Sequence, residues 1–329
     1  MKYSGILMEV LVLECSMVWA LMLFGCSKET VDSASSGVEL WDPPAPGEGV
    51  QLAMDYTVPA YTEAWKCLVY RLETDTVSHV NRLEYQQNYG MHHITISTTG
   101  FVGGQMEPGL YDCESLLMEA MDDTMMIFGS QGYDEGVIQL PEGVAASVPA
   151  GIDVIHELHY VNTTDKPVDL YSRINAYTIS AEEMTEGIWG GNVRDEHINI
   201  PANSSHTEWT RCVLNKDVDV IFLASHMHKL GKEFTIRLFD GTDSGDIFYT
   251  NDDWHNPKIV QYETPMHIAA GTGFEYSCTW ENPSDEPIQY GLTADDEMCN
   301  LTFVHMPYDM DSLCEVVETS DGVLWDPNE

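Results

Sequence analysis

Twelve histidines are the residues in this sequence best suited to metal chemistry. Two of them alternate in His226-Met227-His228, which follows the apolar run of residues 221–225. Because side chains two apart on a strand share a face, this pair could present both imidazoles to one metal ion. Alone, such a pair is a weak signal, since two partly buried, hydrogen-bonded histidines are the commoner explanation.

Two further segments carry histidines at suggestive positions. His92 and His93 are adjacent, so both could bind one ion only at a strand end or a bulge. Glu157 and His159 share one face of a predicted strand, whereas His156 points to the other face and is interpreted as structural. The other histidines are expected to be surface groups or hydrogen-bonded core groups: His79, His197, His206, His255, His267 and His305.

The elements that must position these histidines are short alternating segments separated by turn residues. Examples are residues 66–70, 92–96, 154–160 and 234–238. Residues 113–126 are the main exception, either one helix or a loop. Many short strands without intervening helices predict antiparallel β-sandwiches. A domain boundary is expected between residues 177 and 186, and no internal repeat is strong enough to use.

Length and composition agree with two globular domains. The chain has 329 residues, of which 43% are hydrophobic and 10% aromatic, enough to form real cores. Its 54 acidic residues against 14 basic ones give a formal net charge of -40. This charge argues against a nucleic-acid partner and against docking on anionic lipid through a basic face. A salty or extracellular setting would screen such a surface.

The first 26 residues are predicted to form a signal segment. Their apolar run is too short to span a bilayer comfortably but fits a signal-peptide core. The run ends in Leu23-Phe24-Gly25-Cys26, which resembles a bacterial lipoprotein cleavage box with Cys26 lipidated. An uncleaved membrane-proximal helix and a later start are the alternatives. Residues 27–50, rich in Ser, Gly, Pro and Glu, are predicted to be a linker.

Export changes the interpretation of the cysteines. Beyond residue 26 the chain has an even number, six, which favours disulfides in an oxidising compartment. Six cysteines allow 15 pairings, so the sequence alone does not fix the connectivity. Buried reduced thiols would be the better interpretation only in the cytosol. The expected location is the periplasm or the cell surface, in an outer-membrane or secreted form, with a membrane contact only through Cys26.

Four segments, taken together and in order, resemble the copper type II, ascorbate-dependent monooxygenases. This family includes peptidylglycine α-hydroxylating monooxygenase and dopamine β-monooxygenase. The resemblance extends from about residue 50 to residue 317. It is carried by Gly90-Met91-His92-His93, Glu157-Leu158-His159-Tyr160, His226-Met227-His228-Lys229-Leu230-Gly231-Lys232 and Asp296-Glu297-Met298-Cys299-Asn300-Leu301.

The resemblance implies two all-β, jelly-roll sandwich domains side by side, residues 51–178 and 179–329, each with one copper ion. His92, His93 and His159 would hold the electron-donating copper. His226, His228 and Met298 would hold the copper at which O2 and a small substrate react, with ascorbate or an equivalent as reductant. A soft thioether suits Cu(I), which supports this division, although Met298 alone would be read as a core methionine. A non-catalytic copper-handling lipoprotein is the alternative.

The resemblance also implies three disulfides: Cys67–Cys113, Cys212–Cys314 and Cys278–Cys299. The sequence departs from the peptidylglycine enzymes at positions tied to the carboxylate of the substrate. Ala224 and Thr302 replace their arginine and tyrosine, whereas Asn300 is retained. Glu157 stands where those enzymes carry a glutamine, as a substrate contact or as a partner that orients an imidazole. These departures predict a neutral or cationic small substrate.

Overall fold

The computed structural model describes residues 38–99, 103–120, 124–132, 134–291, 293 and 295–322. The predicted signal segment with Cys26, and residues 27–37 of the predicted linker, lie outside the described residues. Residues Glu39–Glu329 form one compact unit. Within the described part of the chain, no helix has the length and apolar character needed to cross a bilayer.

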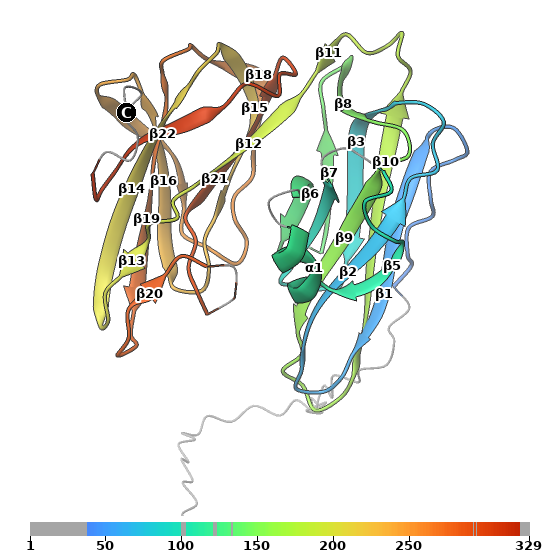
Figure 1. The fold of residues 1–329 in the computed structure, drawn as a ribbon, viewed down its shortest axis with the longest axis horizontal. Helices are drawn as coiled ribbons and strands as arrows, with labels where there is room; N and C mark the ends of the chain where they lie inside the picture. Colours follow the sequence, from blue (N-terminus) through green and yellow to red (C-terminus); the bar gives the residue numbers. More distant parts are fainter. Residues whose placement is uncertain are drawn as a thin grey trace, which may run out of the picture. The chain divides into compact units, whose positions relative to one another are not determined.

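The first sandwich consists of two sheets formed by the strands drawn in blue to green in Figure 1. One sheet has the order β1-β10-β3-β8-β11, with β7 also paired to β3, and the other has the order β5-β2-β9-β4-β6. All pairings are antiparallel except that of β11 with β8. The bounds are β1 Gly49–Val58, β2 Glu63–Arg71, β3 Ser78–Gln87, β4 His93–Thr99, β5 Gly109–Asp112, β6 Thr124–Gln131, β7 Glu135–Gln139, β8 Val144–Val148, β9 Asp153–Val161, β10 Val168–Ile179 and β11 Glu186–Gly187.

The second sandwich is formed by the yellow to red strands in Figure 1. Its sheets have the orders β12-β21-β15-β18 and β17-β16-β19-β14-β22, and β13 pairs separately with β20. The bounds are β12 Trp189–Arg194, β13 Asn199–Ile200, β14 Ser204–Leu214, β15 Val218–His226, β16 Gly231–Phe239, β17 Ser244–Asn251, β18 Val260–Ile268, β19 Gly273–Asn282, β20 Ile288–Gln289, β21 Asn300–Met306 and β22 Cys314–Thr319. The predicted all-β sandwich class is confirmed.

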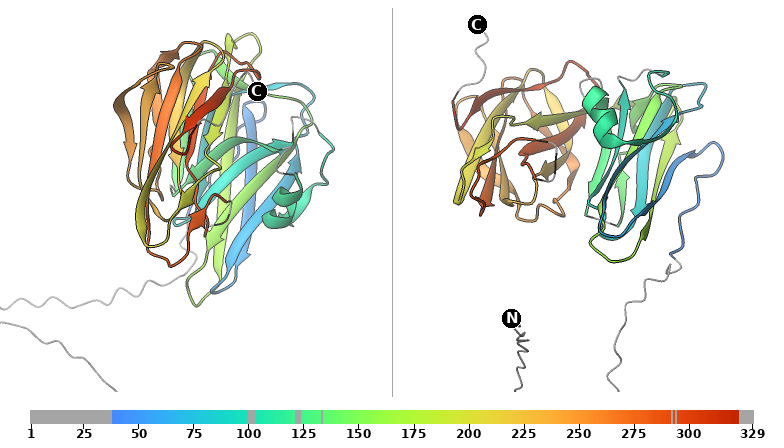
Figure 2. Two further views of the ribbon diagram at one scale, coloured as in Figure 1. Left: turned by 60° about the vertical axis from the view of Figure 1, so that its left-hand side comes forward. Right: turned by 60° about the horizontal axis from the view of Figure 1, so that its bottom comes forward.

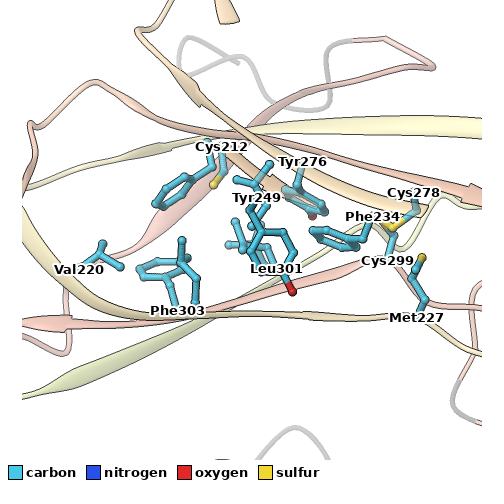
Figure 3. Packing of buried hydrophobic residues seen from close by; sticks show 14 of the residues in the cluster. Cys212, Val220, Met227, Phe234, Tyr249, Tyr276, Cys278, Cys299, Leu301 and Phe303 are labelled. Carbon is cyan, nitrogen blue, oxygen red and sulfur yellow. A yellow bond between two sulfur atoms is a disulfide. The ribbon is translucent and has the colours of Figure 1, made fainter. Parts of the chain in front are cut away.

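Each sandwich has its own buried core between its two sheets. Met54, Ile94 and Leu158 belong to the core of the first. In the second, the rings of Phe234 and Tyr276 stack with centroids 5.8 Å apart (Figure 3). The burial follows from the alternation of apolar residues along the strands, which sends one side of each strand into the core.

The three disulfides expected from the family resemblance are all formed. They join Cys67 to Cys113, Cys212 to Cys314, and Cys278 to Cys299. Cys113 begins the helix α1, Cys113–Ala120, which packs against β2 and β5 (Figure 2). Thus only the first part of residues 113–126 is helical, and β6 begins at Thr124. Three disulfides are consistent with an exported protein.

Both sandwiches contain the same asparagine-centred turn, a recurrence of structure that the sequence did not single out. The Nδ2 atom of Asn162 donates to the carbonyls of residues 58, 59 and 166, and its Oδ1 accepts from Thr164. Asn282 makes the corresponding bonds to residues 200, 201 and 286 and to Ser284. Each asparagine follows a positive-φ glycine by 11 residues. The repeat is therefore carried by turn chemistry and was missed because the strands between differ in sequence.

The hydrogen bonds of the first sandwich extend slightly beyond its predicted limits in the sequence. β11 pairs with β8, so the chain stays attached to the first sandwich up to Gly187, beyond the predicted boundary at residue 178. The described end of the predicted linker also contacts this sandwich. Trp41 donates its backbone N–H to Gln86, and Asn175 donates to the carbonyl of Asp42.

Candidate metal centres

Three histidines converge at one end of the first sandwich. His93 is the first residue of β4 and lies directly opposite His159 of β9. His92 precedes the strand, and its backbone N–H donates to the carbonyl of His159 at 3.1 Å. Gly90, with φ of 79°, makes the turn before it. The strand end that an adjacent histidine pair requires is therefore present, and both imidazoles turn toward His159.

The Nδ1 atoms of these imidazoles face one another. The Nδ1 atom of His92 lies 3.0 Å from that of His93 and 3.1 Å from that of His159. One ligand atom from each of the three residues lies within 4.8 Å of the others. Three nitrogens this close together could hold a single metal ion.

The outer nitrogens of two of these rings face carboxylates. The Nε2 atom of His93 lies 2.8 Å from Glu157 Oε1, and that of His159 lies 2.6 Å from Glu63 Oε1. An ionised carboxylate only accepts hydrogen bonds, so each of these Nε2 atoms carries the proton. In the neutral rings both Nδ1 atoms then present lone pairs toward the same point. The Nδ1 atom of His92 faces both, so a proton on that atom or a metal ion among the three nitrogens would satisfy these lone pairs. Three imidazole nitrogens are a donor set that fits a transition-metal ion.

The environment favours the neutral imidazoles of His92 and His159, the form that metal binding requires. Burial, with the neighbouring His93 and His159, lowers the pKa of His92 to about 3. Burial likewise lowers the pKa of His159, against the opposing effect of Glu63. Burial alone would raise the pKa of Glu157, but His93 and the donors of Thr95 and Trp65 lower it to about 2.

The second histidine pair spans the end of a strand and the segment that follows it. β15 ends at His226, and His228 lies in the turn before β16, so the expectation that both share one strand face was wrong. The side chain of Met227 is 1% exposed and belongs to the core (Figure 3). A Cβ atom on Gly231 would lie 2.9 Å from that of Met227, so only glycine fits there. The two imidazoles are still brought together, with ring centroids 5.1 Å apart.

A fully buried carboxylate, which the sequence did not single out, holds this turn. Glu297 accepts backbone N–H bonds from His228 at 3.0 Å and from Leu230 at 2.7 Å. The indole of Trp280 donates to it at 3.1 Å. Burial raises the pKa of Glu297 to about 7, although these donors oppose the shift. Because Glu297 directly precedes Met298, it ties the histidine turn to the methionine segment.

In the second cluster, each imidazole bonds an oxygen through its Nδ1 atom, which leaves its Nε2 atom without a proton. The Nδ1 atom of His228 lies 3.0 Å from the carbonyl of Asp296, and that of His226 lies 3.0 Å from Gln131 Oε1. Both oxygens accept, so each Nε2 atom carries the lone pair. Burial lowers the pKa of both histidines. Met298 is 8% exposed, and its sulfur accepts from Asn300 at 3.3 Å.

The backbone brings Met298 close to this pair. Asn300 lies directly opposite His226 in the β15–β21 pairing. Cys299 is joined to Cys278, which fixes the segment immediately after Met298. The segments that carry His226, His228 and Met298 thus meet where β15 ends and β21 begins.

Comparison with known proteins supplies the decisive observation. Residues 190–325 match the model of the family "Copper type II ascorbate-dependent monooxygenase, C-terminal domain". The second sandwich therefore carries the C-terminal domain of this family. The match covers the second sandwich and includes His226, His228 and Met298, and the family implies copper, ascorbate, O2 and a small-molecule substrate.

Similarities to solved structures are weak. The tail fibre protein gp63.1 of an E. coli phage has a TM-score of 0.22 and 7% identity; the match covers 79% of this chain and 38% of that one. A structure of infectious bursal disease virus, Gx strain, has a TM-score of 0.17 and 10% identity, covering 83% and 74%. Neither similarity informs the fold or the function.

The structure also places other residues that the sequence analysis named. Ala224 and Thr302 lie directly opposite each other, two residues along β15 and β21 from His226 and Asn300. His156 points into the first core and bonds Ser172 at 2.9 Å, as its structural interpretation predicts. Gln131, which the sequence did not suggest, lies opposite His93 while bonding His226.

Proposed function

We propose that this protein is a copper-dependent monooxygenase that hydroxylates a C–H bond of a small substrate, using O2 and a reductant such as ascorbate. It would bind two copper ions per chain. One would be held by His92, His93 and His159 through their Nδ1 atoms. The other would be held by the Nε2 atoms of His226 and His228 and by the sulfur of Met298, where substrate and O2 would react.

The observation that carries the proposal is the pair of different donor sets in a chain with this family's C-terminal domain. Copper, when bound, would supply the one-electron redox chemistry needed to use O2. Three imidazoles suit an ion that alternates between Cu(II) and Cu(I), and a thioether favours Cu(I). Simple storage does not need two donor sets of different softness.

The residues of the chain have the remaining tasks. Glu157 and Glu63 orient the imidazoles of the first set by accepting from their Nε2 atoms. Glu297 and the Cys278–Cys299 disulfide hold the segments that carry the second set. These contacts orient two ligands of the first set and hold the segments of the second set without a metal, which limits the entropy lost on binding.

For the substrate, we propose a neutral or cationic small molecule. Ala224 and Thr302 face each other beside His226 and supply no cation for a substrate carboxylate. Asn300 is 4% exposed, and within the described residues its Oδ1 atom has no hydrogen-bond partner, so it offers an acceptor to a substrate donor. Glu157 does not contribute to this argument, because its oxygens are occupied by His93, Thr95 and Trp65.

The test is metal analysis of the purified protein, followed by O2 uptake with ascorbate across matched amines and glycine-extended peptides. We expect two copper ions per chain and ascorbate-dependent O2 uptake with an amine. Two bound copper ions without uptake for any substrate would favour the alternative, a copper-handling protein. Efficient turnover of a glycine-extended peptide, comparable to that of any amine, would refute the substrate proposal.

For the location, we propose an exported lipoprotein anchored through Cys26. The three disulfides support export, and the cleavage-box resemblance supports the anchor. Labelling with a palmitate analogue during expression in a bacterial host should mark the wild type and leave Cys26→Ser unlabelled. Equal labelling of both proteins would refute the anchor.

A further inference from the structure

Glu157 is a buried acidic residue with an unusually full set of partners. It lies in the middle of β9, and the whole residue is 8% exposed. Its Oε1 atom lies 2.5 Å from Trp65 Nε1 and 2.8 Å from His93 Nε2. Its Oε2 atom lies 2.5 Å from Thr95 Oγ1. Buried acids are rare and costly unless paired, so these contacts need a reason.

The partners determine the charge state of Glu157 by geometry. The indole N–H of Trp65 can only donate, and the Nε2 atom of His93 donates when its Nδ1 faces a metal. Oε1 therefore accepts twice and carries no proton. Thr95 completes the set by donating its hydroxyl to Oε2. Glu157 is thus held as an anion one imidazole away from the point where the three Nδ1 atoms converge.

A second carboxylate stands behind another ring of the same cluster. Glu63 Oε1 lies 2.6 Å from His159 Nε2. Its side chain is 56% exposed, so water screens its charge more than that of Glu157. No carboxylate contacts an imidazole of the second cluster through its Nδ1 or Nε2 atom, as far as the described residues go; His226 and His228 bond neutral oxygens there.

We propose that Glu157 is a positioning residue that also sets the charge balance of the first metal centre, so that this centre binds Cu(II) in preference to Cu(I). The inference rests on the proposed function, because it assumes that copper occupies the three-histidine cluster. A nearby anion stabilises the doubly charged ion more than the singly charged one. A carboxylate on Nε2–H also makes the imidazole a stronger donor, and losing such a partner typically costs roughly 10–100-fold in metal affinity.

The two centres therefore differ in the charge of the groups behind their imidazoles. The first, with anions behind two of its rings, is the better electron donor. The second, with neutral oxygens behind its rings and a thioether, is better suited to holding Cu(I). The charge of Glu157 thus contributes to the difference in potential between the two centres.

The experiment uses Glu157→Gln in a His228→Ala background, in which only the first centre should load. Glutamine keeps the size and one acceptor oxygen but removes the charge. Competition with chromophoric chelators should give a Cu(II) affinity roughly 10-fold lower or more, with a smaller change for Cu(I). A tenfold difference between the two losses raises the reduction potential by about 59 mV for a one-electron couple.

Glu208→Gln is the matched control. Glu208 is 4% exposed and lies 2.8 Å from His206 Nε2, so it is also a buried glutamate paired with a histidine, but its histidine belongs to neither cluster. Glu208→Gln should leave the Cu(II) and Cu(I) affinities and the reduction potential of the first centre unchanged. The side chain of Glu63 is largely exposed, so Glu63→Gln should fold even if Glu157→Gln does not. Glu63→Gln should shift the reduction potential in the same direction by a smaller amount.

Three results would overturn the inference in distinguishable ways. Equal loss of Cu(II) and Cu(I) affinity in Glu157→Gln, with no change in potential, would reduce Glu157 to a structural support. Cu(II) and Cu(I) affinities of Glu157→Gln within twofold of those of Glu208→Gln would show that Glu157 has no role at the first centre. Absence of copper from the first centre of the parent protein would overturn the proposed function together with this inference.

Discussion

The two candidate metal centres are built by different means. His93 and His159 sit on paired strands, and side-chain carboxylates on their outer nitrogens fix their orientation. His228 and Met298 lie just outside the strands, and their segments are fixed by Glu297 and by a disulfide. The first centre is therefore positioned by the sheet itself, whereas the second depends on contacts between turns.

This difference suggests where each centre is vulnerable. A sheet face tolerates the loss of one side-chain contact, because the ladder of backbone hydrogen bonds holds the strand. A turn has no such ladder, so its geometry depends on the few groups that satisfy its N–H donors. Perturbing the supports should therefore damage the second centre more than the first.

The largest effect is expected from removing a ligand of the second centre. His228→Ala should lower the copper content from two to about one per chain and abolish turnover, because the reaction centre loses a donor. His159→Ala should remove the other copper instead. Elemental analysis and O2 uptake measure both. Full copper and full activity in His228→Ala would contradict the assignment.

Breaking the disulfide of the second centre should have the next largest effect. Cys278 and Cys299 are 21 residues apart, and replacing both by serine should lower the free energy of unfolding by about 3 kcal/mol in the loop-entropy model. Copper should be lost from the second centre before the first. The double variant Cys67→Ser/Cys113→Ser is the control, and it should leave the second centre loaded. Equal copper loss in both would argue against a local role.

Glu297→Gln tests the carboxylate clamp. The amide NH2 group must face one of the N–H donors of Leu230, His228 or Trp280, which leaves a buried donor unpaired at a cost of about 1–3 kcal/mol. Chemical denaturation and copper analysis should register a loss of stability and weaker binding at the second centre. Glu208→Gln again serves as the buried control. If the two variants behave alike, the clamp does not position the second centre.

Glu297 also shows the limit of the sequence. The DEMCNL segment and the histidine blocks predicted the family, the sandwich class and the disulfides. Nothing in the segment indicated that this acid would be buried, because its partners are backbone N–H groups some 70 residues earlier in the chain. Similarly, the alternation rule extended β15 through His228, but Met227 enters the core and the chain turns.

The first cluster was more accessible to sequence reasoning. His93 and His159 lie opposite each other in the β4–β9 pairing. The period of two predicts the face of each side chain on its strand, whereas the family resemblance supplied the grouping. The repeated asparagine turns were visible as matching spacings after Gly151 and Gly271, yet few side chains carry them. Local patterns could predict faces of strands, whereas contacts between distant turns required the structure.

The last effect concerns pH and compares equivalent positions of the two sandwiches. His156 and Tyr276 each follow the repeated glycine by five residues and are fully buried. Burial lowers the pKa of His156 from 6.5 to about 3, so its stabilising contribution is complete above pH 6.5 and is lost as the pH falls toward 3.

Glutamine at this position cannot titrate. The free energy of unfolding of the wild type relative to His156→Gln should therefore fall below pH 6.5, by up to about 1.4 kcal/mol per pH unit. Urea denaturation of both proteins at pH 7.5 and pH 5 measures the difference. A stability difference that is constant with pH would mean that His156 is not held neutral in the folded protein.

The central claim, two copper centres of different donor chemistry, is tested most directly by X-ray absorption of the reduced, copper-loaded His159→Ala variant. Only the second centre should then contain copper. The account predicts a copper–sulfur scatterer from Met298 in this variant and its absence in Met298→His. A spectrum with nitrogen and oxygen ligands alone in His159→Ala would contradict the account.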